Sequence, residues 1–274
     1  MTASGPYITF ALAWSVSAYK NMIFVNEYGP KTGMQWLGND VTKNARHTYM
    51  SLDYGKTWKT IFDLNTYLTT QQGRANTDGV HLHGVAWDPY WDRIWVTFGD
   101  DVNGTVYSDD LGESWQTAHY GNTFSSPHQN VGIMPMPKTV LFGTDGYPNG
   151  VQRIDRRLGK ASGTYVIEQA YTINPGVNEL THLCQSIHKV EREGDDGPVL
   201  FGFGAETAVA PSHIVATYDG FTFTKLWEDS QSQAAGRGLR SITGPNLRGE
   251  LIVGSNDGRE SNMWSKWQGR VRIY

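Results

Sequence analysis

The chain has 274 residues, with 23 Lys plus Arg, 27 Asp plus Glu and a formal net charge of −4. A chain of this length can bury a large core, and its weak negative charge without any Lys/Arg cluster argues against a nucleic-acid partner. The single cysteine, Cys184, excludes an intrachain disulfide, so packing must supply the stability.

The first 14 residues, MTASGPYITFALAW, have neither a charged n-region nor a long apolar h-region. No apolar run reaches the length of a membrane-spanning helix. We therefore expect a soluble chain with no export signal and no membrane insertion. No Pro/Ser/Gly-rich linker and no block of like charge divides the sequence, which predicts a single domain over residues 1–274.

The composition favours strands, because Gly, Trp, Tyr and Phe are abundant and no segment has a convincing helical period. One strand pattern, an apolar run that ends in small and acidic residues, occurs repeatedly along the chain. Its copies lie at residues 22–27, 93–101, 139–146, 198–206 and 250–258. They are on average about 57 residues apart, so five repeats account for nearly the whole chain.

Each copy follows another strand-like run and a tight turn, such as Asp88-Pro89 before residues 93–101, and precedes two more strands. Antiparallel groups of four at this period predict an all-β fold, a single five-bladed β-propeller of four-stranded antiparallel blades. The last repeat ends after three strands, while the strand at residues 7–14 has no partner in the pattern. We expect this N-terminal strand to complete the last blade and close the ring, which removes two exposed sheet edges.

Two octets, SLDYGKTW at 51–58 and SDDLGESW at 108–115, share the pattern Ser-x-Asp-x-Gly-x-Thr/Ser-Trp, and a weaker version, TYDGFTF, spans 217–223. The repeat places each of them between the third and fourth strands of a blade. There the Asp carboxylate can accept backbone N–H bonds across the turn, Gly takes a positive φ and Trp packs into the blade. The residues given this structural role are Ser51, Asp53, Gly55, Thr57, Trp58, Ser108, Asp110, Gly112, Ser114 and Trp115.

These octets resemble the Asp-box, or BNR repeat, of sialidase-like β-propellers. The resemblance implies a propeller fold, a peripheral and structural role for the octets, and action on glycans outside cells. Sialidases also have six blades, an N-terminal Arg-containing motif and an arginine triad. Here residues 7–10 contain no Arg, and no three arginines occupy matching blade positions. We therefore do not expect a typical sialidase.

In a four-stranded antiparallel blade, the start of the innermost strand and the end of the second strand lie at the same edge. Around a ring these edges converge on one face of the central channel, opposite to the octets. The sequence therefore predicts a ligand-binding face built from titratable side chains. Its members are His81, His83, Asp100, His128, Asp145, His182, Glu206, Arg237, Arg240 and Asp257, with Glu27 at the equivalent position of the first repeat.

Three interpretations of this face stay open: a solvated polar lining, a sugar-binding pocket, and a catalytic or metal site. The histidines come from separate strands, so no local ligand spacing indicates a metal. We predict no cofactor, with a divalent cation as an open alternative, and assign no catalytic residue. The histidines His47, His119, His188 and His213 are scattered, and we expect structural or exposed roles for them.

The resemblance implies action on glycans outside cells, yet the sequence has no export signal and no disulfide. A phage virion protein would combine these properties, because it is made inside the host and exposed after lysis. Five-bladed propellers serve as platforms in phage receptor-binding proteins, a resemblance of fold alone. The sequence thus predicts a carbohydrate-binding β-propeller of a phage tail or virion, located in the virion or outside cells. Its expected partners are a host surface glycan, other virion proteins and further copies of itself. The alternatives are a polysaccharide lyase or glycoside hydrolase acting at the channel face, and a purely structural assembly hub.

Overall fold

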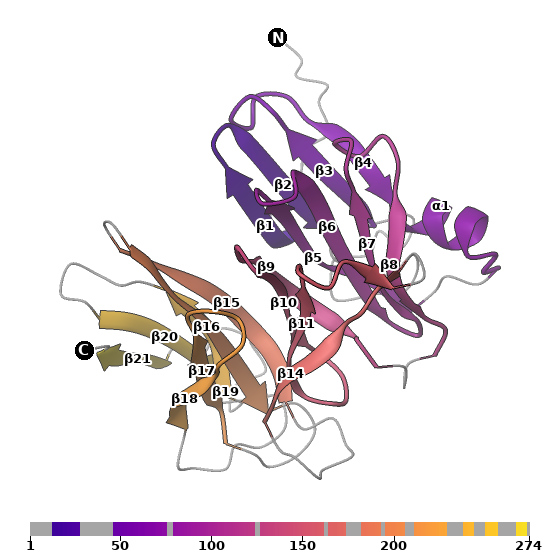
Figure 1. Cartoon of the computed structure of the whole chain (residues 1–274). Coiled ribbons are helices and arrows are strands. Elements are labelled where there is room, and N and C mark those ends of the chain that lie inside the picture. Colours follow the sequence, from indigo (N-terminus) through magenta and orange to yellow (C-terminus); the bar gives the residue numbers. More distant parts are fainter. Residues whose placement is uncertain are drawn as a thin grey trace. The chain divides into compact units, whose positions relative to one another are not determined.

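The computed structural model describes residues 13–27, 46–75, 79–123, 127–161, 164–173, 182–192, 195–205, 211–228, 238–243, 250–256 and 267–272. The chain divides into two compact units, Met1–Phe124 and Ser125–Tyr274 (Figure 1). The single domain that the sequence predicts stays a prediction. The described part of the chain contains no helix with the length and hydropathy that a bilayer crossing requires.

The first unit contains two four-stranded sheets in which each strand pairs antiparallel with the next one along the chain. The first sheet consists of β1 (Ala13–Tyr19), β2 (Met22–Glu27), β3 (His47–Ser51) and β4 (Lys59–Asp63). The second sheet consists of β5 (Val80–Asp88), β6 (Arg93–Asp100), β7 (Asn103–Ser108) and β8 (Gln116–Gly121).

The second unit contains three larger sheets and a short hairpin, all of them antiparallel. The third sheet consists of β9 (Asn130–Pro135), β10 (Thr139–Thr144), β11 (Gly150–Asp155) and β14 (Glu168–Thr172), and the hairpin of β12 (Lys160–Ala161) and β13 (Thr164–Tyr165). The fourth sheet consists of β15 (His182–Arg192), β16 (Asp195–Ala205), β17 (His213–Thr217) and β18 (Thr224–Glu228). The fifth sheet consists of β19 (Gly238–Thr243), β20 (Glu250–Asn256) and β21 (Trp267–Arg272).

The repeated strand pattern predicted from the sequence is the second strand of every sheet, namely β2, β6, β10, β16 and β20. All-antiparallel sheets in chain order fit a propeller-like fold, and the fifth sheet has three strands among the described residues. The predicted closing strand at residues 7–14 lies outside the described residues except for its last two. These belong to β1, where Ala13 pairs with Glu27 of the first sheet. The number of blades and the closure of the ring stay predictions.

One short helical segment lies between β4 and β5, where the sequence shows no helical period. The helix α1 (Leu64–Thr66) continues directly into the π-helix η3 (Tyr67–Gln71). The carboxylate of Asp63 starts it by accepting hydrogen bonds from the backbone N–H groups of Asn65 and Thr66. The segment is too short to produce a helical period in the sequence, and it is held by the burial of its leucines rather than by its own length.

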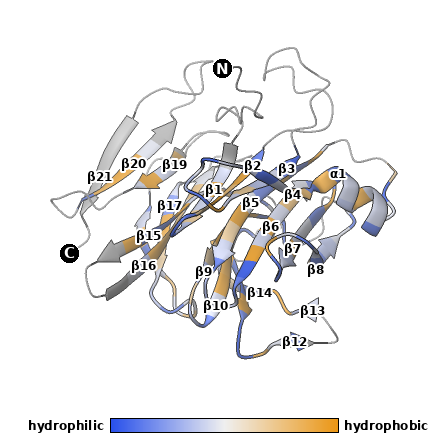
Figure 2. Cartoon of the chain, turned by 90° about the horizontal axis from the view of Figure 1, so that it is seen from above, coloured by the Kyte–Doolittle hydropathy of each residue, from blue (hydrophilic) through white to orange (hydrophobic). Residues whose placement is uncertain are grey.

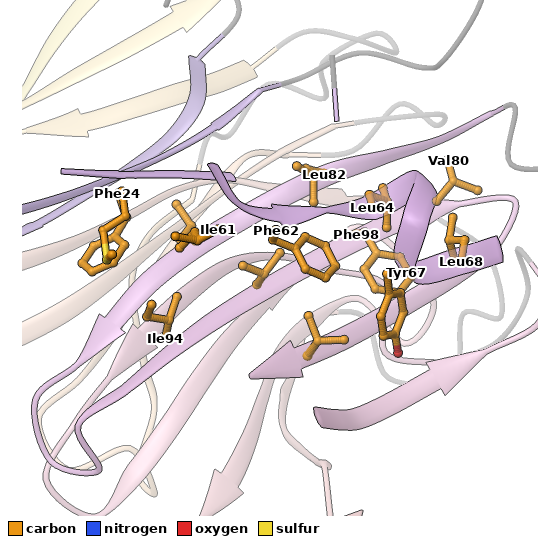
Figure 3. Packing of buried hydrophobic residues seen from close by; sticks show 14 of the residues in the cluster. Phe24, Ile61, Phe62, Leu64, Tyr67, Leu68, Val80, Leu82, Ile94 and Phe98 are labelled. Atoms are coloured by element: carbon orange, nitrogen blue, oxygen red, sulfur yellow. The ribbon is translucent and has the colours of Figure 1, made fainter. Parts of the chain in front are cut away.

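The hydrophobic core of the first unit lies between its two sheets and this helical segment. Figure 3 shows Phe62 and Phe98 beside the side chains of the helical segment, with Phe24 of the same cluster farther away from it. Figure 2 shows that hydrophobic residues fill much of β5 and β6, the two strands that contribute most to this core. Each fully buried aliphatic or aromatic side chain contributes about 1.5–3 kcal/mol, so this core fixes both sheets.

The first strands of successive sheets are joined by serine hydroxyl groups. In the first unit, Ser15 Oγ accepts from the backbone N–H of Val85 (3.1 Å) and Ser17 Oγ accepts from that of Trp87 (3.2 Å). Because residue numbers rise in the same direction along both strands, β1 and β5 run parallel and begin at the same edge. In the second unit, Ser186 Oγ of β15 accepts from the backbone N–H of Ile242 in β19 (3.1 Å). These bonds align the strand ends that carry the predicted site.

Candidate functional site

Both octets form the turn that the sequence predicts between the third and fourth strands of a sheet. In the first octet, Ser51 Oγ accepts from the backbone N–H of Gly55 (2.8 Å), and Asp53 Oδ1 accepts from that of Thr57 (2.9 Å). Gly55 has a φ of 82°, and the indole of Trp58 donates to the carbonyl of Gly55 (3.0 Å). The donors from Thr57 and Ser51 lower the pKa of Asp53 to about 2. These hydrogen bonds close the turn.

The second octet repeats this turn and also joins the two sheets of the first unit. Asp110 accepts from the backbone N–H (2.9 Å) and hydroxyl (2.6 Å) of Ser114, and Ser108 Oγ accepts from the N–H of Gly112 (2.8 Å). The indole of Trp115 donates to the carbonyl of Ile61 in β4 (2.8 Å). The weaker copy at 217–223 forms the same kind of turn between β17 and β18, with its carboxylate accepting from two backbone N–H groups. The octets therefore form turns closed by their own side chains, and their purely structural role stays a prediction.

The opposite edge of each sheet, where the first and third strands begin and the second and fourth strands end, is called the polar edge here. In the second sheet it carries two imidazoles and a carboxylate. His81 Nδ1 lies 2.8 Å from Asp100 Oδ2, and His81 Nε2 lies 3.1 Å from His83 Nε2. The two rings meet edge to face with centroids 4.7 Å apart. The sequence prediction that His81 and His83 point to the same side, away from Leu82 in the core, agrees with this geometry.

The electrostatics of this group favour an ionised carboxylate. Burial alone would raise the pKa of Asp100, but the hydrogen bond from His81 and the charges of His81 and His83 together lower it. Asp100 also has a φ of 90°, a backbone conformation that residues with a side chain rarely adopt. Strain of this kind persists only where the surrounding structure fixes the residue, and it is frequent at functional sites.

The polar edge of the first sheet carries a second group, arranged around Glu27. Its Oε2 lies 2.9 Å from His47 Nδ1, and its Oε1 accepts from the hydroxyl of Tyr49 (2.9 Å). The hydrogen bond that His47 donates to Glu27 raises the pKa of His47. Burial, reinforced by the charge of Glu27, raises the pKa of Tyr49 as well. Glu27 thus faces two proton donors.

In the second unit, the polar edge of the third sheet combines amides with a carboxylate. Gln129 Nε2 donates to Asp145 Oδ2 (3.3 Å), and the backbone N–H of Asp145 donates to the carbonyl of Gln129 (2.7 Å). His128 lies just before β9, with Nδ1 2.7 Å from Gln152 Oε1. Burial lowers the pKa of His128. Tyr147 follows Asp145 by two residues, in the loop between β10 and β11. It is 45% exposed to solvent.

The polar edge of the fourth sheet holds a pair of buried histidines. The rings of His182 and His213 meet edge to face with centroids 5.0 Å apart. His182 Nε2 lies 2.8 Å from the carbonyl of Pro211, and His213 Nδ1 lies 3.6 Å from Glu228 Oε2. Burial, together with the neighbouring His182, lowers the pKa of His213 to about 4. The pair is therefore uncharged at neutral pH.

The side chains of four of the ten predicted ligand residues are not described by the structure. Glu206, Arg237 and Asp257 fall outside the described residues, and Arg240 lies in β19 without a described side chain. The other six lie at polar edges: His81, His83 and Asp100 together in the first unit, and His128, Asp145 and His182 in the second. No observation assigns any of them a ligand, so their binding role stays a prediction.

Sequence reasoning left three histidines out of these edges, namely His47, His213 and His119. It took His47 and His213 for scattered residues, but each begins the third strand of its sheet and faces the groups described above. The signal was available, because an innermost strand start and a third strand start lie at the same edge of an antiparallel sheet. His119 and Asn103 of the second sheet follow the same rule, with 3.2 Å between His119 Nε2 and Asn103 Oδ1.

No protein-family model and no curated protein matches this sequence. Among solved structures, the chain is similar to the GH74 enzyme of Niastella koreensis, with a TM-score of 0.54 and 15% identity over 95% of this chain and 36% of that one. It is also similar to the SapL1 lectin, solved in complex with alpha methyl fucoside, with a TM-score of 0.51 and 10% identity over 94% of this chain and 78% of the lectin. Both are β-propellers, and at these identities the likeness concerns the fold alone. The chain has a β-propeller-like fold.

Proposed function

We propose that the protein is a carbohydrate-binding β-propeller that holds a glycan at its polar edges. The observation that carries the proposal is the gathering of imidazoles, carboxylates and amides at this edge in four successive sheets, while the opposite edge of the first two sheets is occupied by the closed turns of the octets. The similarity to a lectin of comparable fold supports it.

The third sheet has the chemistry that a sugar requires. A pyranose presents hydroxyl groups around its rim and C–H groups on its faces, so it is bound by carboxylate and amide groups together with an aromatic ring. Asp145 and Gln129 provide the polar groups, and the half-exposed ring of Tyr147 lies two residues after Asp145. We place the first contact with the glycan here.

A binding experiment with paired tyrosine variants tests this placement. A glycan array identifies a ligand, and calorimetry then compares Tyr147→Ala and Asp145→Asn with the unchanged protein. We expect each substitution to weaken binding at least about tenfold, which corresponds to about 1.4 kcal/mol. Tyr218→Ala is the matched control, because Tyr218 is 60% exposed at an octet-type turn of the same unit. Equal losses in Tyr147→Ala and Tyr218→Ala would rule out a site at the third sheet.

We further propose that this glycan belongs to a host cell surface and that the protein is a phage tail or virion component with a five-bladed closed ring. Weak single sites of this kind gain avidity when several copies bind one surface. Native mass spectrometry should therefore find a symmetric oligomer, and tail or baseplate genes should neighbour the coding gene. A strictly monomeric protein among unrelated genes would count against the virion role.

One observation keeps an enzyme as the second candidate. Glu27 faces both His47 and Tyr49, the pair of residue types that can transfer protons during polysaccharide cleavage. The pKa of both is raised, which favours the protonated form of each. Incubation with envelope polysaccharides, followed by assays of new reducing ends and of unsaturated uronate absorbance, decides the question. Turnover that is lost in His47→Gln, His83→Ala or His128→Ala would replace the binding proposal with a lyase or hydrolase.

A further inference from the structure

We infer that His81 and His83 form a binding site for one transition-metal dication of the Zn²⁺ or Cu²⁺ type, oriented by Asp100. Among the described residues, these three are the only group of three metal-ligating types whose ligand atoms all lie within 4.8 Å of one another. The inference concerns a metal ion rather than a sugar, so it stands or falls independently of the glycan proposal.

The distance between the two imidazoles suits a shared ion. Two nitrogens that bind the same metal at about 2.0–2.1 Å lie about 2.9 Å apart at a right angle and about 3.4 Å apart in a tetrahedron. His81 Nε2 and His83 Nε2 are 3.1 Å apart, between these limits. The separation of the two nitrogens would therefore need almost no change for both to bind one ion, once the proton shared between them is displaced.

Asp100 determines which nitrogen of His81 is presented. Its Oδ2 lies 2.8 Å from His81 Nδ1, so the ring donates its Nδ1–H to the carboxylate and keeps the Nε2 lone pair directed at His83. A histidine that binds a metal through one nitrogen usually donates the other N–H to a carboxylate in this way. Asp100 is thus a positioning residue of the site and not the third ligand.

The backbone holds His83 in place. The ladder between β5 and β6 shifts register between Leu82 and Val85, and the backbone N–H of Gly84 within this bulge donates to Thr97 Oγ1 (2.9 Å). Bulges of this kind redirect a side chain and are frequent beside functional sites. Because both histidines lie on a strand and are buried, their rings keep the required geometry better than residues of a loop would.

The second histidine pair of the protein lacks these features and serves as a control. In the pair of His182 and His213, Nε2 of His182 lies 2.8 Å from the carbonyl of Pro211, which makes this nitrogen a donor. The carboxylate of Glu228 lies 3.6 Å from His213, beyond a hydrogen bond. We therefore expect no metal binding at His182 and His213, although their rings also meet edge to face.

The donor atoms also select the class of ion. Imidazole nitrogen suits Zn²⁺, Cu²⁺ and Ni²⁺, whereas Ca²⁺ and Mg²⁺ require several oxygen ligands. With two protein nitrogens, the remaining coordination positions would be filled by water or by an added ligand. We expect one Zn²⁺ or Cu²⁺ per chain and no Ca²⁺ at this site.

The experiment uses the full chain without a histidine tag. Calorimetry with Zn²⁺ measures affinity and stoichiometry, and electron paramagnetic resonance of the Cu²⁺ form counts the bound nitrogens from their hyperfine splitting. The unchanged protein should bind one ion and show two equivalent nitrogens. His83→Gln should weaken Zn²⁺ binding more than about 100-fold, and Asp100→Asn about 10–100-fold. His213→Gln should leave affinity and spectrum unchanged.

The outcomes separate a metal site from a hydrogen-bonded histidine pair. Equal Zn²⁺ affinity in the unchanged protein and in folded His83→Gln would overturn the inference. So would a Cu²⁺ spectrum with one nitrogen, which needs no variant and therefore decides the matter even if His83→Gln fails to fold. An affinity unaffected by Asp100→Asn would remove the positioning role of Asp100.

Discussion

Asn149, in the loop between β10 and β11, accepts a hydrogen bond through Oδ1 from the backbone N–H of His182 at the start of β15, at 3.3 Å. This bond joins the polar edges of the third and fourth sheets, because it connects the start of a third strand to the start of the next first strand. Both residues are buried. The histidine pair of the fourth sheet is therefore held by a residue of the third.

Removing this acceptor should destabilise the second unit. In Asn149→Ala the buried N–H of His182 loses a partner, and an unsatisfied buried donor costs about 1–3 kcal/mol. Urea denaturation should show a loss of this size. Asn149→Asp keeps an acceptor oxygen at the same position and is the control. If both variants lose the same stability, the bond to His182 is not the cause.

The octet turns should make stability depend on acidity. Hydrogen bonds from Thr57 and Ser51, and from Ser114 and Ser108, lower the pKa of Asp53 and Asp110 to about 2. A carboxyl group whose pKa is lower in the folded chain stabilises the fold above its unfolded pKa, near pH 4, and this contribution is lost as the pH falls towards 2. The urea midpoint should fall over this range.

Substitution of the octet carboxylates tests this acid dependence. Asp53→Asn and Asp110→Asn should be less stable than the unchanged protein at pH 7, with a smaller further loss between about pH 4 and pH 2. Thr57→Val, which removes one donor but keeps the backbone N–H, should give an intermediate profile. If the stability of every variant changed with pH as it does in the unchanged protein, the octet carboxylates would not be the source of the acid dependence.

The strand order and the octet turns could be predicted from the sequence because both depend on local patterns. Two examples are the apolar run that ends at Asp100 and the Ser-x-Asp-x-Gly pattern at Ser108. Each forms its strand or turn through residues close together in the sequence, so it can be recognised without tertiary contacts. The helix after Asp63 could not be predicted in this way. Leu64, Tyr67 and Leu68 are buried by packing against the two sheets, which no local pattern reports.

The sequence could predict which types of residue gather at the candidate site, but not which side chains contact each other there. The rule that strand ends share an edge predicted that His81, Asp100 and His182 lie at polar edges, where the structure has them, while their binding role stays a prediction. It was applied only to first and second strands, which left out His47 and His213 on third strands. Which nitrogen meets which oxygen depends on bulges and rotamers that are fixed by packing, so distances such as 3.1 Å between the imidazoles required the structure.

Close packing between β10 and β15 predicts an intolerant glycine. A Cβ atom at Gly143 would lie 2.2 Å from Sγ of Cys184 and 2.7 Å from its Cβ, with Ile187 also near. Gly143→Ala should therefore cost about 1–3 kcal/mol through overpacking, measured by thermal or urea denaturation. The double variant Gly143→Ala, Cys184→Ala should lose less than the sum of the single losses, because the two sites share one space. Simple additivity would contradict this contact.

The only cysteine should be unreactive in the folded protein. Burial raises the pKa of Cys184 to about 12, so at pH 8 the thiol is both protonated and shielded. Ellman's reagent should therefore release no colour from the folded chain and one equivalent in urea. The free thiol of glutathione, assayed at the same pH, shows that the reagent is active. Rapid labelling of the folded protein would show that β15 opens locally.

The histidines of the two units should respond to acid in opposite directions. Burial and the neighbouring His182 lower the pKa of His213 to about 4, with the attraction of Glu228 and the repulsion of Lys225 acting as smaller influences. The unfolded chain therefore binds a proton more readily, and stability falls as the pH drops from about 6.5 to about 4, by at most about 3 kcal/mol from this residue. His213→Phe, which fills similar space and has no group to protonate, should flatten this part of the urea profile and be the more stable protein near pH 5.

His47 provides the opposite case within the same molecule. The hydrogen bond to Glu27 raises its pKa, so its contribution to stability is complete below the unfolded pKa of about 6.5 and is lost as the pH rises through the folded pKa. His47→Gln should accordingly lose stability at pH 5 and lose less at pH 8. Since both variants replace one buried or half-buried imidazole, a change of the same sign in both would mean that the response comes from elsewhere in the chain. Opposite signs would assign the acid response to the hydrogen bond between His47 and Glu27 in one unit, and to the burial of His213 beside His182 in the other.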